Sequence, residues 1–220
     1  DKVIDGVFGL ANKLYGITLT KRTDIPVYHP DVEAFEVKDS DGSHLGIFYV
    51  DYFPRAGKRG GAWMNNYREQ QAGIRPIICN VCSFTKPVGD TPSLLTLDEV
   101  ETLFHEFGHA LHGLLSNCQY KGTAGTNVAR DFVELPSQIN EHWAMEPEVL
   151  KMYAKHYQTG ETIPDALIEK MLAQRTFNQG FITTELLAAA ILEMKLHNLT
   201  STEGLDVVAS EKHAMDKLRL

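Results

Sequence analysis

The stretch that decides the fold is Thr96-Leu-Asp-Glu-Val-Glu-Thr-Leu-Phe-His105-Glu-Phe-Gly-His109. Thr96 and Glu99 have the spacing of a capping box, which predicts that a helix begins here. At about 100 degrees per residue, the apolar residues of this helix share one stripe about 120 degrees wide. They are Val100, Leu103, Phe104, Phe107, Leu111, Leu114 and Leu115. One face of the helix is therefore expected to pack, while the histidines project from a different side.

His105-Glu106-x-x-His109 is an H-E-x-x-H pattern. Two imidazoles four residues apart lie one helical turn apart, so both can reach one zinc ion. Glu106 lies at one flank of the pair, where it can take a proton from a metal-bound water and later pass it to a leaving amine. His112 lies about 10 Å along the axis from His105, too far for both to bind one ion. We expect His112 to line the site or to bond locally.

A catalytic zinc usually has three protein ligands and one open position. The metzincin extension would need glycine at position 112 and histidine at 115, whereas this chain has His112 and Leu115. The third ligand must therefore come from elsewhere, and the next helix supplies two candidates, Glu134 and Glu141.

Residues 128–143 are expected to form that next helix. Its apolar stripe consists of Val128, Phe132, Leu135, Ile139 and Trp143. This stripe leaves Glu134 and Glu141 together on another face, and helical spacing does not choose between them. Pro136 removes one backbone donor and should kink the helix close to Glu134.

The remaining patterns predict an α+β fold that is mainly helical. Residues 5–15 have helical spacing and stop at Gly16, residues 32–53 alternate around a turn at 39–43, and residues 77–84 read as a third strand. Residues 54–61 look like a basic surface loop. Everything after residue 92 is helix-like, and the apolar stripe from Leu186 to Leu196 is expected to be core.

We therefore expect a single catalytic region over residues 1–220. Its first part, about residues 1–95, holds a helix and a small antiparallel sheet, and its second part, about residues 96–220, holds the helices that carry chemistry. No repeat, low-complexity tract or linker separates domains in this sequence.

Composition excludes several classes of protein. The 220 residues are 43% hydrophobic and 23% charged, which are globular values, and the net charge of -8 disfavours nucleic acid as a partner. No apolar run reaches the roughly 18 residues of a membrane helix, so no membrane partner is expected. Three cysteines cannot make a disulfide framework, which favours a cytoplasmic location. The first residue is Asp1 rather than methionine, which suggests a mature form or a cut piece.

Several linked motifs resemble one known family. Phe104-His-Glu-Phe-Gly-His109-Ala-Leu-His112, Gly125-Thr126 and Asp131-Phe-Val-Glu134-Leu-Pro-Ser-Gln138 resemble the M3 family of zinc metallopeptidases, which includes thimet oligopeptidase and oligopeptidase A. The continuation Ile139-Asn-Glu-His-Trp-Ala144, with Phe177-Asn178 and Glu185-Leu-Leu187, is most similar to its bacterial peptidyl-dipeptidase branch. The resemblance covers essentially the whole chain and implies a zincin-like fold.

The resemblance also implies residue roles. His105, His109 and Glu134 would bind one zinc ion per chain, and Glu106 would be the general base. Glu101 or Asp131 would orient a ligand histidine, although either can also be an ordinary solvated carboxylate. The segment containing Val81, Cys82 and Ser83, with His112 nearby in the site, would contact an extended peptide by strand addition; the plain alternative is an internal strand.

The implied reaction is hydrolysis of short peptides by Glu-assisted attack of zinc-bound water, with release of C-terminal dipeptides. One alternative is a general endo-acting oligopeptidase of the same family. Another is a catalytically silent peptide-binding fragment, because family members are much longer and carry a Gly-rich loop and further histidine and tyrosine residues beyond the region that ends at Leu220. The expected partners are short peptides, and the sequence carries no signal of oligomeric state.

Overall fold

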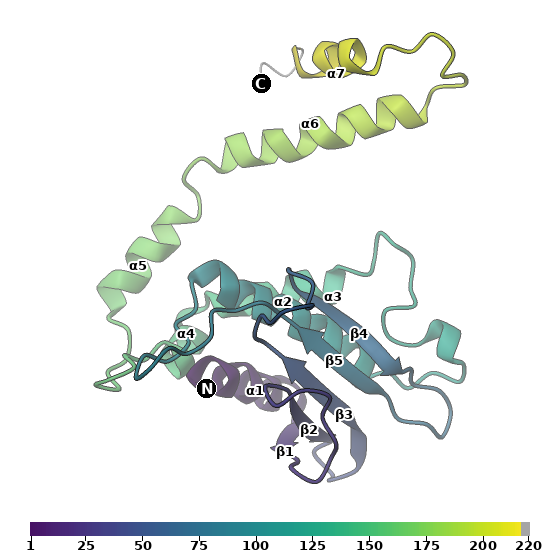
Figure 1. Cartoon of the computed structure of the whole chain (residues 1–220). Coiled ribbons are helices and arrows are strands. Elements are labelled where there is room, and N and C mark those ends of the chain that lie inside the picture. Colours follow the sequence, from purple (N-terminus) through teal and green to yellow (C-terminus); the bar gives the residue numbers. More distant parts are fainter. Residues whose placement is uncertain (217–220) are drawn as a thin grey trace. The chain divides into compact units, whose positions relative to one another are not determined.

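The computed structural model describes residues 1–216 and has an α+β fold (Figure 1). The chain divides into two compact units, residues 1–163 and the residues from Pro164 on. The elements of the first unit are α1 (Lys2–Tyr15), β1 (Thr18–Lys21), β2 (Glu33–Lys38), β3 (His44–Asp51), β4 (Trp63–Arg68), β5 (Ile77–Val81), α2 (Leu97–Leu114), a short 3-10 helix (Lys121–Thr123), α3 (Leu135–Ala144) and α4 (Pro147–Tyr153). The second unit contains α5 (Asp165–Gln174), α6 (Gln179–His197) and α7 (Val207–Asp216).

The sheet of the first unit is mixed, with strand order β1-β2-β3-β5-β4. The predicted hairpin is confirmed as β2 and β3, but β3 and β5 run parallel, so the expectation of an antiparallel sheet was wrong. Two strands were missed. β4 lacks an alternating apolar pattern because it is an edge strand with no fully buried residue, and the four-residue β1 is also an edge strand.

Aromatic side chains join the sheet to the helices that lie on one of its faces. Phe107 of α2 lies 5.7 Å from Phe8 of α1 and 5.6 Å from Phe48 of β3, measured between ring centroids. The capping box between Thr96 and Glu99 is present, and the predicted apolar stripe is buried except for Leu115. This packing fixes the rotation of α2 about its axis and thereby the direction of its histidines.

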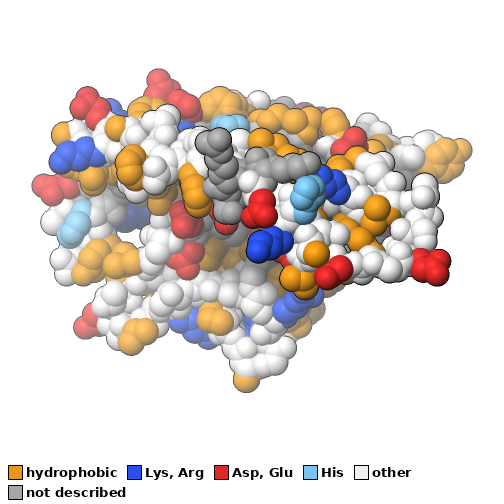
Figure 2. Space-filling view, turned by 90° about the horizontal axis from the view of Figure 1, so that it is seen from above, with side chains coloured by type: hydrophobic (Ala, Val, Ile, Leu, Met, Phe, Trp, Pro, Cys, Tyr) orange, Lys and Arg blue, Asp and Glu red, His pale blue; other side chains and the backbone are white. Residues whose placement is uncertain are grey.

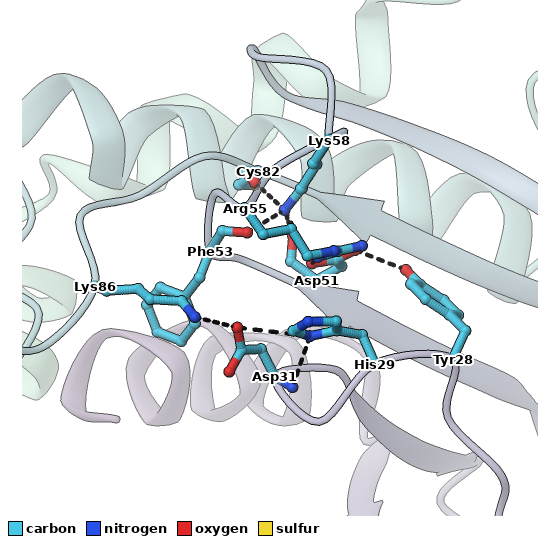
Figure 3. Close-up of polar contacts among 9 residues, drawn as sticks. All are labelled: Tyr28, His29, Asp31, Asp51, Phe53, Arg55, Lys58, Cys82 and Lys86. Atoms are coloured by element: carbon cyan, nitrogen blue, oxygen red, sulfur yellow. Dashed lines mark hydrogen bonds and ion pairs between the residues drawn. The ribbon is translucent and has the colours of Figure 1, made fainter.

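The connection from β3 to β4 differs from the expected basic surface loop. Arg55 and Lys58 turn inward and contact Asp51 at the end of β3 (Figure 3). The Lys58 side chain is only 4% exposed, whereas Arg59 next to it is exposed. The expectation was wrong for Lys58 because the carbonyl oxygens of Asp51, at the end of β3, and of Cys82, directly after β5, accept hydrogen bonds from its ammonium group.

The predicted helix over residues 128–143 is shorter than expected. Residues 130–134 form turns, and α3 begins at Leu135, so Pro136 occupies the first turn rather than a kink. A proline is accepted there because the first turn has no intrahelical N–H bond to lose. The expected apolar stripe was also wrong: Phe132, Leu135 and Ile139 are exposed, and α3 instead buries Ser137, Asn140 and Ala144.

The second unit exposes much apolar surface. Leu186, Leu187 and Met194 are each more than half exposed, so within the described chain the expected core stripe of α6 is wrong. Hydrophobic side chains are visible on the face drawn in Figure 2. The apolar residues of helix α6 are spread around the helix rather than gathered on one face, and its one buried residue is Ala188. Among residues 1–216, no helix is both long and apolar enough to cross a membrane.

Candidate metal centre

Three side chains converge beside α2. The Nε2 atoms of His105 and His109 lie 3.2 Å and 3.0 Å from one oxygen, Oε2 of Glu134. One potential ligand atom from each residue lies within 4.8 Å of the other two. The two histidines come from successive turns of α2, and Glu134 is the residue immediately before α3, so the site depends on how these two helices meet.

A glycine allows the two helices to approach. A Cβ atom added to Gly108 would lie 2.7 Å from the carbonyl oxygen of Pro136 and 2.7 Å from Cα of Ser137. Any side chain at position 108 would therefore push the first turn of α3 away from α2. The Asn140 side chain also donates a hydrogen bond of 2.6 Å to the carbonyl oxygen of Phe104. Because Glu134 directly precedes α3, these contacts between α2 and α3 place it next to the two histidines.

The second candidate carboxylate, Glu141, occupies a different place. Its Oε1 atom lies 2.5 Å from Nδ1 of His105, on the side of the ring away from Glu134. An ionised carboxylate only accepts hydrogen bonds, so Nδ1 of His105 carries the proton and donates it. This tautomer leaves the lone pair of Nε2 directed at Glu134. Both glutamates therefore lie next to His105, Glu134 beside Nε2 and Glu141 beside Nδ1, so the two can have different roles.

The charge states of the site favour binding of a cation. Burial lowers the pKa of His109, which favours its neutral, electron-donating form. Burial raises the pKa of Glu134, but a hydrogen bond from Ser137 and the nearby histidines together lower it by more, so the net shift is downward. Neutral imidazoles and an ionised carboxylate are the forms in which these groups bind metals.

A cleft with a volume of about 360 Å³ lies beside these three side chains, and Glu106 also lines it. The cleft is lined by Ala62, Trp63, Met64, His105, Glu106, His109, Thr126, Val133 and Glu134. Glu106 is 6% exposed, and its Oε2 atom is buried without a hydrogen-bond partner among the described residues. Burial raises the pKa of Glu106, while a main-chain hydrogen bond from Met64 acts in the opposite direction. A buried carboxylate with a free oxygen is suited to accept a proton.

The other residues singled out in the sequence lie outside this constellation. His112 does not line the cleft; its Nδ1 atom is buried without a described partner, and burial lowers its pKa. Glu101 lies close enough to Tyr153 to raise the pKa of that tyrosine, in addition to the larger effect of burial. Asp131 is exposed in the turn before α3. The described partner of Nδ1 in His105 is Glu141 rather than either of these carboxylates.

The segment expected to pair with a peptide is internal. β5 has β3 on one side and β4 on the other, and the N–H of Cys82 donates to the carbonyl oxygen of Asp51. The side chains of Val81 and Cys82 are buried, and Ser83 does not line the cleft. The plain alternative of an internal strand is therefore what the structure contains, and the edge strand beside the cleft is β4.

Five cleft residues were missed from the sequence: Ala62, which comes directly before β4, and four others. Trp63 and Met64 belong to the unpredicted strand β4, and Thr126 and Val133 lie in the turns between α2 and α3. A signal for Thr126 was present, because Gly125-Thr126 was among the motifs that carried the family resemblance. Nothing in the local pattern around Trp63 or Met64 indicated a cleft wall.

An H-E-x-x-H helix with a converging third carboxylate defines a candidate metal centre of the metallopeptidase type. Comparison with known families agrees with this class. The model of peptidase family M3 matches residues 1–218, so the chain belongs to this family.

Individual relatives are similar over nearly the whole chain. A dipeptidyl carboxypeptidase of Salmonella typhimurium is 52% identical over 207 residues, and one of Escherichia coli is 51% identical over 206 residues; each match covers 93% of this chain. Oligopeptidase A of Escherichia coli is 40% identical over 203 residues, or 90% of this chain. The chain spans about 30% of the length of each of these relatives.

Proposed function

We propose that this chain carries the zinc site and the general base of a peptidase that hydrolyses short peptides. The observation that carries the proposal is the convergence of His105, His109 and Glu134 within 4.8 Å, beside a cleft that Glu106 also lines. Two imidazole nitrogens and one carboxylate oxygen match the donor set of catalytic zinc sites with an open fourth position. Lone pairs that face one another at 3.0 Å and 3.2 Å are compatible with a cation between them.

In this proposal each residue has one task. Bound zinc supplies a Lewis acid and lowers the pKa of water. Glu106 accepts a proton from the attacking water and returns it to the leaving amine. Glu141 holds the Nδ1 proton of His105 and so keeps Nε2 directed at the site. The fold would then be a zincin-like catalytic region, and the family match over residues 1–218 supports one region that includes both compact units.

The peptide is proposed to lie along β4. Its outer edge pairs with no other described strand, and its first residues, Trp63 and Met64, line the cleft. An extended peptide can add to such an edge through main-chain hydrogen bonds. This replaces the pairing with β5 that the sequence suggested.

Release of C-terminal dipeptides is the proposed specificity. It is supported by the names of the two relatives at 52% and 51% identity, whereas oligopeptidase A is 40% identical. Digesting one peptide with a free and with an amidated C-terminus tests it. Dipeptides from the free form alone support the proposal, and equal internal cleavage of both forms favours an endo-acting oligopeptidase.

Glu106→Gln in the zinc-loaded chain tests the mechanism. Turnover of a fluorogenic peptide should fall about 100-fold to 10,000-fold, the usual contribution of general acid-base catalysis, while zinc content stays unchanged. Glu99→Gln is the matched control, because glutamine also completes a capping box on the same helix. Full activity of Glu106→Gln would overturn the assignment of the base.

A further inference from the structure

A polar cluster around the buried Asp51 lies at the end of β3, on the chain that leads to the cleft. Asp51 is 2% exposed and accepts two hydrogen bonds from Arg55, of 2.7 Å and 2.9 Å, and one of 2.9 Å from the Tyr28 hydroxyl. Figure 3 shows Lys58 reaching the same carboxylate. We call Asp51, Arg55, Lys58 and Tyr28 the Asp51 cluster. One carboxylate therefore faces two cations.

Lys58 does more than neutralise Asp51. Its ammonium group lies 2.9 Å from both Oδ1 and the carbonyl oxygen of Asp51, 2.8 Å from that of Phe53 and 2.5 Å from that of Cys82. An ammonium group has three hydrogens, so these four acceptors saturate it. Lys58 has no donor left for a ligand, and its bonds join the ends of β3 and β5 to the loop.

Between Lys58 and β4 the loop has little else to fix it. Gly60 and Gly61 follow Arg59, and an added Cβ at either position would meet nothing within 4 Å, so neither lies against another part of the fold. Ala62, the first cleft residue, is four residues after Lys58, which limits their separation to about 14 Å. The start of β4 is thus held by Lys58 on one side and by pairing with β5 on the other.

Lys58 also bonds the chain next to the second attachment. Trp63 and Met64 pair with Val81 and Asn80 of β5, and Lys58 binds the carbonyl oxygen of Cys82, directly after that strand. Loss of the ammonium group would release the loop and remove one hydrogen bond next to the strand against which the cleft wall is registered, while that strand stays paired with β3. The metal-binding candidates come from α2 and the turn before α3, so they do not depend on this attachment.

We propose that Lys58 is a positioning residue for peptide binding: it holds the Ala62–Met64 wall in the register that an extended peptide needs. The proposal rests on the proposed function, because it takes β4 as the peptide-binding edge. Lys58 acts through β4 and touches neither substrate nor metal.

Lys58→Met tests the proposal in the zinc-loaded chain. The change removes the charge and leaves Asp51 and Arg55 as a balanced pair. Two probes are compared: acetohydroxamate, a metal ligand too short to extend along β4, and a short peptide that carries a hydroxamate. We expect affinity for the peptide probe to fall about 10-fold to 100-fold, because small displacements of a binding surface have effects of this size. Acetohydroxamate affinity and zinc content should stay unchanged.

Arg59→Met is the matched control, since it removes an exposed cation from the same loop. Amide hydrogen exchange over residues 62–68 should become faster in Lys58→Met and not in Arg59→Met. Equal peptide affinity in the two variants would overturn the role of Lys58. If the unchanged chain binds zinc but neither probe, the proposed function fails first, and this proposal with it.

A second variant keeps the test decisive if Lys58→Met does not fold. Two glycines inserted between Gly60 and Gly61 leave the Asp51 cluster intact and loosen its connection to β4. Peptide affinity should fall as in Lys58→Met, again with acetohydroxamate affinity unchanged. An insertion that leaves peptide affinity unchanged would show that the anchor does not position the cleft wall.

Discussion

The candidate metal centre and the Asp51 cluster are polar groups beside the same sheet, yet their charges are arranged in opposite ways. In the Asp51 cluster every acceptor faces a donor, and one carboxylate meets two cations. At the candidate metal centre, acceptor atoms of His105, His109 and Glu134 face one another. A cluster that is satisfied internally holds the chain together, whereas one whose lone pairs converge is suited to bind a cation from outside.

The sharpest test of this contrast is Glu134→Ala. Loss of one of three protein ligands should lower zinc affinity by more than about 1,000-fold, or about 4 kcal/mol. Stability without metal should hardly change, because the Glu134 side chain is half exposed. Competition with a chelator and urea unfolding of the metal-free chain measure the two effects. Unchanged zinc affinity would place the metal elsewhere.

Asp51→Ala should show the reverse pattern. Removing one partner of a buried ion pair commonly costs about 3 to 5 kcal/mol, because the remaining charges stay buried without compensation. Urea unfolding of the metal-free chain measures this loss. Asp24→Ala is the control, since Asp24 forms an exposed pair with Arg22 and its loss should destabilise the chain far less. Equal losses in both variants would contradict the structural role of the cluster.

Glu141→Ala should have an intermediate effect on the metal. Carboxylates that orient a ligand histidine commonly contribute about 10-fold to 100-fold in metal affinity. The loss should therefore be clearly smaller than in Glu134→Ala, as measured with the same chelator. A larger loss for Glu141→Ala would mean that Glu141 is the ligand and Glu134 its support.

Acid should weaken the Asp51 cluster in a defined range. Burial raises the pKa of Asp51, but hydrogen bonds from Arg55, Lys58 and Tyr28 outweigh it and lower the pKa from 3.8 to about 2. The stabilisation is complete above the unfolded value of 3.8 and is lost as pH falls through about 2, by about 2 kcal/mol. Unfolding of the original chain and of Asp51→Asn, followed from pH 5 to pH 2, should converge by this amount. Parallel curves would contradict it.

Local spacing was enough to predict the helix that carries the histidines. The capping box at Thr96 and the i, i+4 pair of His105 and His109 lie within one element, so their geometry follows from helix dimensions alone. The choice between Glu134 and Glu141 did not follow, because both glutamates approach His105 and only the packing of α3 separates them.

Features that depend on contacts between distant chain segments could not be predicted from the sequence. A lysine in a glycine-rich loop looks exposed, and the burial of Lys58 depends on Cys82, 24 residues later. Pro136 was expected to bend a helix because the start of α3 could not be located from apolar spacing. The exposed stripe of α6 has a core-like sequence, and sequence alone does not tell whether a partner element covers it.

The close approach at Gly108 changes how the H-E-x-x-H motif is to be read. The pattern leaves its two middle positions open, but in this fold the second of them has no room for even a methyl group. A motif search that accepts any residue at this position will also find chains with two correctly spaced histidines in which α3 cannot approach closely enough to supply the third carboxylate. For this fold the informative sequence signature is the pair of histidines together with glycine, which has no side chain beyond a hydrogen atom, at the second middle position.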